Sequence, residues 1–173
     1  MKQNAQTTRQ DCPISVGIGK ISIPSYLDKP QIVTLISDNE IAQDEFNRWA
    51  ESIEECISRV LHEEISQKCD QIKIMTFPFD KHLELDYKVK LDVHDFLPNE
   101  TKKTITLFCY WRITDKNRNM IIRRNSAIVV NYNQDEQQPD DKYTYIVSGM
   151  EQAVIQLSTE ISEAISAITS EKQ

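Results

Sequence analysis

The chain has 173 residues, of which 39% are hydrophobic and 27% charged, and its formal net charge is −7. Its length and composition are those of a single folded domain with its own core. The acidic balance argues against a broad nucleic-acid surface, which needs clustered lysine and arginine, and against adsorption to an anionic membrane face. No apolar run approaches the roughly 20 residues that a membrane span requires.

The first twelve residues are polar, and no apolar segment of the kind found in signal peptides follows Met1. We therefore expect a disordered tail or tether over 1–12 and one folded domain over 13–170. On this pattern alone, the chain is either cytoplasmic or begins behind a removed signal.

A strand is predicted over 13–23, where Ile14, Val16 and Ile18 alternate with small residues. Gly17 and Gly19 resemble the start of a phosphate-binding loop, but no Gly-Lys-Ser/Thr follows them. A bulge or a close approach of two backbones is the preferred interpretation of these glycines.

The stretch 20–50 is unusually apolar for a connector and contains Pro24 and Pro30, which each lack a backbone donor. We interpret it as the end of a strand, a proline-bounded turn, a second short extended run and the start of a helix. An apolar segment of this kind must be covered, either by the rest of the domain or by a partner.

Apolar residues at intervals of three and four predict a helix that is capped by Asp44 and ends near Cys69. Its apolar positions are Phe46, Trp49, Ile53, Ile57, Val60, Leu61 and Ile65. Alternation then predicts strands over 71–77, 84–96, 104–114 and 120–132. The last three of these strands are expected to form an antiparallel meander with one wet face.

A second helix is expected after Asp140 or Asp141, with an apolar seam from Tyr143 to Ile168. A seam of this length is typical of a helix laid across a sheet, and pairing with a partner helix is the alternative. The element order β-α-β-β-β-β-α predicts an α+β fold: a mostly antiparallel sheet with two long helices packed on one face.

The residues do not point to a catalytic, cofactor or metal site, so we do not expect an enzyme. Asp92 and His94 share the wet face of a predicted strand, but no further ligands follow at a recognisable spacing. His62 lacks the second histidine of the zinc-protease motif. Four cysteines occur without a Cys-x-x-Cys pair and are interpreted as mostly buried thiols: Cys12, Cys56, Cys69 and Cys109.

Two segments of the apolar stretch resemble the PqiC/YmbA-type lipoproteins, the ABC-type transport auxiliary lipoprotein family. They are SIPSYLDKPQIVTLISDNEI, over 22–41, and FNRWAESI, over 46–53. The resembling residues are Ile23, Pro24, Tyr26, Leu27, Asp28, Pro30, Gln31, Ile32, Val33, Asp38, Asn39, Arg48, Trp49, Ala50 and Glu51. Agreement extends more loosely from about residue 13 to 170.

The resemblance implies a non-catalytic bacterial envelope protein that is anchored in the periplasm by a lipidated cysteine, at the outer membrane in preference to the inner one. Such proteins act beside MCE-domain proteins and associated membrane transport components, which carry phospholipids or other hydrophobic molecules between membranes. Cys12 does not look like the lipid-attachment cysteine, because Gln10 and Asp11 precede it and no apolar segment does. We expect the sequence to start after the anchor.

We predict that the apolar segment 21–36 contacts an MCE-domain partner or a second copy of the chain, in a homo-oligomer that could be a ring. The predicted contact residues are Tyr26, Leu27, Pro30, Gln31, Ile32, Val33, Leu35 and Ile36. Pro24, Phe46 and Trp49 are predicted structural anchors, the two aromatic residues by burying their rings against the sheet. The alternative is a lipid-binding module that holds a hydrophobic ligand between its sheet and helices.

Overall fold

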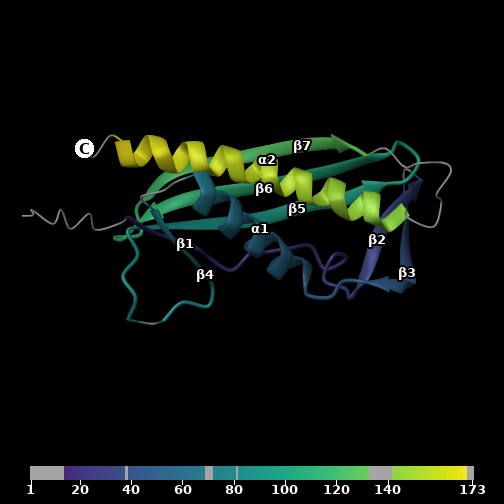
Figure 1. Ribbon diagram of the computed structural model, residues 1–173, viewed down its shortest axis with the longest axis horizontal. Helices are drawn as coiled ribbons and strands as arrows, with labels where there is room; N and C mark the ends of the chain where they lie inside the picture. Colours follow the sequence, from purple (N-terminus) through teal and green to yellow (C-terminus); the bar gives the residue numbers. More distant parts are fainter. Residues whose placement is uncertain (1–13, 38, 69–71, 81, 133–141, 171–173) are drawn as a thin grey trace, which may run out of the picture.

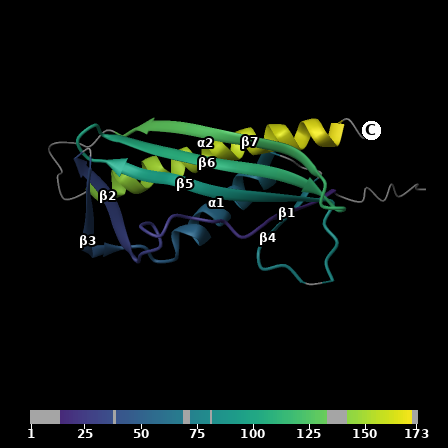
Figure 2. The same cartoon turned by 180° about the vertical axis from the view of Figure 1, so that it is seen from behind.

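The computed structural model describes residues 14–37, 39–68, 72–80, 82–132 and 142–170. These residues form one seven-stranded mixed sheet and two helices. The strands are β1 (Ile14–Ile18), β2 (Gln31–Ser37), β3 (Glu40–Arg48), β4 (Ile72–Thr76), β5 (Tyr87–Asn99), β6 (Thr104–Asp115) and β7 (Met120–Asn131), and the helices are α1 (Ile53–Lys68) and α2 (Lys142–Ser170). Both helices lie on one face of the sheet (Figure 1). In the opposite view the strands lie nearer to the viewer than the helices (Figure 2). The predicted α+β class is confirmed.

Strand β5 is the centre of the sheet, because other segments pair with it along both of its edges. One edge pairs with β6 from Tyr87 to Asn99, and β6 pairs in turn with β7, which confirms the predicted meander. On the other edge, β1 pairs with the first residues of β5 in parallel, and β2 meets its last residue. Strand β4 extends the sheet beyond β1, and β3 extends it beyond β2.

The apolar connector pairs with β5 from Val89 to Val93, in part of the gap that β1 and β2 leave along this strand. The amide of Gly19 donates to the carbonyl of Val89 at 2.8 Å. Ser22 donates to Leu91 at 3.0 Å and accepts from Val93 at 2.8 Å. The predicted strand over 13–23 is therefore a strand to Ile18 followed by a single bridge at Ser22. These bonds satisfy backbone groups that would otherwise be left unpaired at the middle of a buried strand.

The core lies between the helices and the inner face of the sheet. Alternate residues of β5 and β6 are buried there, as their sequence period predicts. Most of the seam of α2 is also buried, although Val147 is partly exposed. A chain of hydrogen bonds ties this helix to the sheet: the indole of the buried Trp111 donates to the hydroxyl of Ser126 at 2.9 Å, and Ser126 donates to Glu160.

Gly17 of β1 is closely covered by two side chains. A Cβ atom at this position would lie 2.4 Å from Cδ1 of Leu85 and 2.8 Å from Cζ of Phe79. Both neighbours of Gly17 are side chains, so the predicted close approach of two backbones does not apply there. It applies at Gly19, where a Cβ atom would lie 3.2 Å from the backbone oxygen of Val89.

The structure differs from the expected helix in its first part. Residues Glu40–Arg48 form β3, the second strand of a hairpin with β2, and α1 begins at Ile53. Ser52 caps this helix: its hydroxyl accepts from the amide of Glu55 at 3.2 Å, and its amide donates to Oε2 of Glu55 at 3.1 Å. This reciprocal pair is a capping box, which satisfies amides that the first turn leaves free. The prediction that Asp44 caps the helix is therefore wrong.

Several sequence predictions lie outside the described residues. They concern the tail over 1–12, Cys12, Cys69, and the proposed caps Asp140 and Asp141. Among the described helices, neither is long and apolar enough to cross a membrane.

The unequal burial of two isoleucines in β2 leads to a prediction about stability. Ile32 is only 5% exposed, whereas Ile36, on the same strand, is 38% exposed. Ile32→Ala should lower the free energy of unfolding by about 2–5 kcal/mol, because it leaves a cavity in the core. The matched variant Ile36→Ala should cost under about 1 kcal/mol. Urea denaturation measures both values, and equal losses would show that β2 is not packed as described.

Candidate functional site

The predicted contact residues do not form one surface. Leu27, Ile32 and Val33 are buried in the core, so in this conformation they are closed to a partner. Pro30 and Ile36 are exposed, and three others are partly buried: Tyr26, Gln31 and Leu35. The prediction that the whole 21–36 segment faces a partner therefore needs correction, because the strand edge of β5 and the core cover most of it. Partner contact by its exposed residues stays a prediction.

The predicted anchors also separate. Pro24 and Trp49 are both partly buried. Trp49 packs against the core, and its amide donates to the carbonyl of Pro30 at 2.8 Å. Phe46, in contrast, is 93% exposed. Its prediction as a buried anchor is wrong, because β3 is an edge strand and nothing in the described chain covers this ring.

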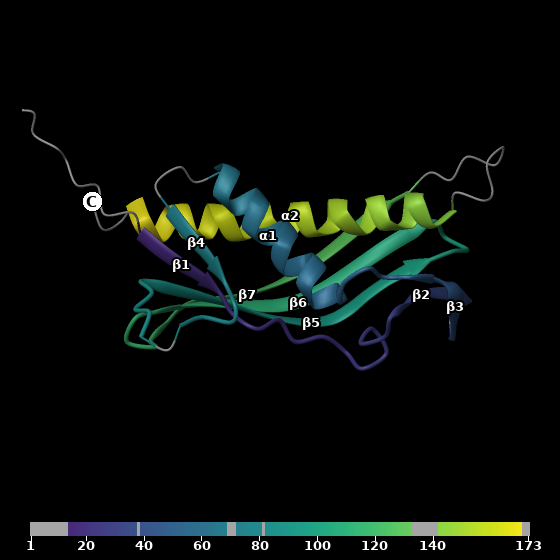
Figure 3. The ribbon, with the colours of Figure 1, turned by 60° about the horizontal axis from the view of Figure 1, so that its bottom comes forward.

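Three exposed apolar side chains lie on the β2–β3 hairpin: Ile36, Ile41 and Phe46. We call them the hairpin patch. The hairpin projects at one end of the molecule, whereas the start of β1 and the end of α2 lie at the opposite end (Figure 1, Figure 3). Sequence reasoning did not select Ile41, and it assigned Phe46 to the core, because residues 40–48 show no apolar–polar alternation that would mark them as a strand.

Polar contacts hold the hairpin against the body of the domain. The hydroxyl of Tyr143, in α2, donates to Oδ2 of Asp44 at 2.6 Å. Glu100, in the turn after β5, accepts from the hydroxyl of Thr34 at 2.7 Å and from Nζ of Lys142 at 3.0 Å. The hairpin is thus fixed in place by α2 and by the β5–β6 turn.

Asp44 is the electrostatic centre of this attachment. Its Oδ1 atom also accepts from the amides of Phe46 and Asn47, at 2.8 and 3.0 Å. The hydrogen bond from Tyr143, followed by these amide bonds, lowers the pKa of Asp44 from 3.8 to about 2. Burial and the nearby carboxylate raise the pKa of Tyr143 above its usual range, so this hydroxyl remains a donor.

A small apolar groove opens between the two helices. Its volume is about 130 Å³, and its walls include Trp49, Ile57, Val60, Met150 and Val154, above Phe96 of β5. Arg59 of α1 and Glu151 of α2 stand on its rim. The groove is smaller than the roughly 300–1,000 Å³ of pockets that enclose drug-sized ligands.

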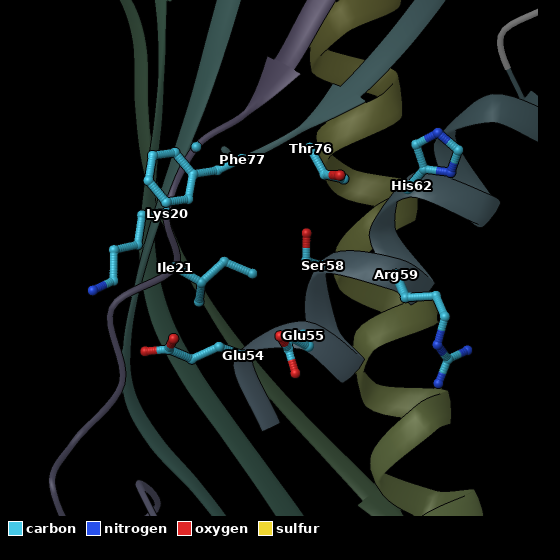
Figure 4. A pocket seen from close by; sticks show the side chains of 10 residues that line it. Lys20, Ile21, Glu54, Glu55, Ser58, Arg59, His62, Thr76 and Phe77 are labelled. Carbon is cyan, nitrogen blue, oxygen red and sulfur yellow. The ribbon is translucent and has the colours of Figure 1, made fainter. Parts of the chain in front are cut away.

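A larger cleft, of about 330 Å³, lies between the connector after β1 and the outer side of α1. Figure 4 shows the hydroxyl of Ser58 near its centre, with Lys20 and Arg59 extending away on opposite sides. The guanidinium of Arg59 is held by Glu51 at 2.9 Å. The cleft carries both signs of charge and no convergent set of polar groups, so its chemistry favours no ligand class.

The remaining candidates for chemistry have structural surroundings. Burial and Glu51 raise the pKa of Cys56 to about 11, and burial raises the pKa of Cys109 to about 12, so both thiols stay protonated and weakly reactive. The ring of His94 lies edge-on to those of Tyr110 and Phe108, with centroids 5.0 and 6.1 Å away. Within the described residues, no group of three or more potential ligands could hold a metal ion.

The attachment at Asp44 makes a pH prediction. Because the pKa of Asp44 is lower in the folded state, its contribution to stability is present above pH 3.8 and is lost as the pH falls toward 2. Tyr143→Phe removes the strongest hydrogen bond to the carboxylate and should raise the pKa of Asp44 toward its ordinary value. An NMR titration of the Asp44 carboxyl carbon measures this shift. Tyr145→Phe is the control, and equal titrations of all three proteins would contradict the assignment.

Comparisons with known proteins add the following. The model of one family, described as ABC-type transport auxiliary lipoprotein component, matches residues 1–162. No curated protein matches the chain. Among solved structures, an uncharacterized protein is 16% identical with a TM-score of 0.75, over 88% of this chain and 92% of its own. A Xanthomonas campestris protein of the DUF330 family is 14% identical with a TM-score of 0.72, over 93% of this chain and 89% of its own. The PelC dodecamer from Paraburkholderia phytofirmans is 6% identical with a TM-score of 0.50, over 86% of each chain.

Proposed function

Because the chain belongs to the ABC-type transport auxiliary lipoprotein family, we propose that it is a non-catalytic accessory subunit of an MCE-type, ABC-linked transport system. The system would move phospholipid or other hydrophobic molecules between bacterial membranes. The subunit acts in the periplasm through protein–protein contacts, held by a lipid anchor at the outer membrane. The observation that carries the proposal is the exposed apolar hairpin patch of Ile36, Ile41 and Phe46 on this family's fold.

The position of the hairpin supports this role. The start of β1 and the hairpin lie at opposite ends of the molecule (Figure 3). An anchor that precedes β1 would place the hairpin on the side away from the membrane that holds it. Exposed apolar side chains at that end suit contact with a protein that approaches from the periplasm.

The alternative, a lipid-binding module, has less support. Side chains fill the space between sheet and helices, with Leu107, Leu157 and Ile161 almost fully buried there. The groove between the helices, at about 130 Å³, is too small to enclose the acyl chains of a phospholipid. Docking of partners therefore fits the domain better than storage of cargo.

Self-assembly belongs to the proposal as well. The PelC protein, which shares the fold at 6% sequence identity, forms a dodecamer, and this supports self-assembly of the present chain. We propose a homo-oligomer for this chain, in which several hairpin patches would face an MCE-domain partner together.

The proposal is tested by capture of the partner in the native envelope. The lipid-anchored protein is crosslinked in cells, purified, and assayed for the co-isolated MCE-domain protein. Ile41→Asp places a charge in the hairpin patch and should reduce capture at least about tenfold, because a charge is desolvated in the contact. Ile41 is 43% exposed in the free domain, so the fold should persist.

Val129→Asp is the matched control, since it makes the same kind of change at an exposed residue of β7. It should capture the partner as the wild type does. Undiminished capture by Ile41→Asp would contradict the docking role of the hairpin. Native mass spectrometry that found one phospholipid on each monomer would favour the lipid-binding module instead.

A further inference from the structure

Phe46 is the most exposed large apolar side chain of the described chain, at 93%. Burial of a phenylalanine side chain is favourable, and the isolated domain leaves this ring in water. The residue is nevertheless held firmly, because its amide donates to Asp44, and Asp44 is in turn bonded to Tyr143 of α2. An exposed aromatic ring on a fixed backbone is a preorganised contact, since little conformational freedom is lost when it binds.

The groove between α1 and α2 has the size of one aromatic ring. Apolar cavities of about 150 Å³ accept benzene, and this groove has about 130 Å³. Trp49 and Met150 stand in its walls, and the flexible thioether of a methionine adapts to an inserted ring. Phe46 of the same chain does not occupy the groove, because the ring is exposed.

Charges beside the two features are complementary. Glu45 and Arg48 flank Phe46 in the sequence and are both exposed. The rim of the groove carries Arg59 on one helix and Glu151 on the other. Arg59 is already bonded to Glu51 of its own chain, so the charge left to be matched is Glu151, and a ring inserted between the helices can bring Arg48 toward it. Such pairs fix the orientation of a contact more than they add to its affinity.

We propose that Phe46 of one copy of this chain inserts into the groove between α1 and α2 of the next copy. The inference rests on the proposed self-assembly and names its contact: in the assembly Phe46 makes the self-contact, and Ile36 and Ile41 of the hairpin patch remain for the MCE-domain partner. Donor and acceptor are different surfaces, so each copy offers one of each, and the contact repeats from copy to copy until a ring closes. A stable contact buries about 1,200–2,000 Å² in total, so Phe46 is the hot spot of a larger interface rather than the whole of it.

The first measurement is the oligomeric state of the full chain, by sedimentation velocity over a range of concentrations. The wild type should assemble, and Phe46→Asp should be monomeric or at least about tenfold weaker in self-association. Its thermal midpoint should match that of the wild type, because the ring is exposed. Phe77→Asp is the matched control: Phe77 is 53% exposed on another part of the surface, and this variant should assemble normally.

The second measurement tests that the two surfaces meet. Val147 lies partly exposed on the wall of the groove, and Val147→Trp should fill the groove without entering the core. This variant alone should also be monomeric. A mixture of Phe46→Asp, which keeps the groove, and Val147→Trp, which keeps the ring, should form a one-to-one heterodimer and nothing larger. A mixture that stays monomeric would overturn the proposed pairing.

A charge exchange gives an independent reading. Arg48→Glu alone and Glu151→Arg alone should each weaken assembly, and the double variant should restore it. If the two residues do not meet, the double variant should instead lose the sum of the two single losses in association free energy. Wild-type assembly by Phe46→Asp overturns the inference, as does a wild type that is monomeric throughout. So does a monomer that binds vesicles of phosphatidylethanolamine and phosphatidylglycerol through Phe46, because the ring would then contact membrane.

These outcomes are separable from the proposed function. A monomeric Phe46→Asp variant that still captures the MCE-domain protein would uphold both the self-contact and the accessory role. Normal assembly of the Phe46→Asp variant together with loss of partner capture by Ile41→Asp would reject the self-contact alone. Normal capture by Ile41→Asp with a monomeric Phe46→Asp variant would reject the docking role of the hairpin alone.

Discussion

The structure depends on the second edge of strand β5. Its first edge is completed by β6 along its whole length, whereas the other must be paired by segments from the first third of the chain. Strand β1, Ser22 and β2 divide that edge among them, and the prolines fall in the turn between Ser22 and β2. Unpaired backbone groups in a buried strand are costly, so this pairing explains why an apolar connector lies where a regular strand would be expected.

The same constraint produces the exposed hairpin. Once β2 has reached the end of β5, the chain must turn back before it can start α1, and it does so as β3, an edge strand with a partner on one side only. Tyr143 and Lys142 of α2 then fasten the hairpin region through Asp44 and Glu100. An apolar surface is thereby presented on a rigid support at the end of the molecule far from the start of β1 (Figure 1). This arrangement suits the contact role that we propose for this auxiliary transport component.

The regular spacing of apolar residues made most of the fold predictable. The remaining elements were mispredicted because a few residues matched the pattern of another element by chance. The alternation in β5, β6 and β7 and the seam of α2 were sufficient to predict these elements and their buried residues. The start of the first helix was predicted too early because Phe46 and Trp49 continue the apolar spacing of α1. Asp44 also accepts hydrogen bonds from two amides, as a helix cap does, although no helix begins there. The sequence marked the apolar stretch as unusual. It could not show that Ile32 and Val33 are buried, because burial depends on parts of the fold that are distant in sequence, such as Asn99, with which β2 pairs.

The central claim is that this domain works through contacts of the hairpin and of the groove between the helices. Hydrogen exchange of the wild-type protein, measured by mass spectrometry at low and high protein concentration, tests it most directly. The account predicts that amide protection increases with protein concentration in residues 36–48 and 147–154. The amides of β7 should exchange at the same rate at both concentrations. Protection confined to β7, or exchange independent of concentration in both regions, would contradict it.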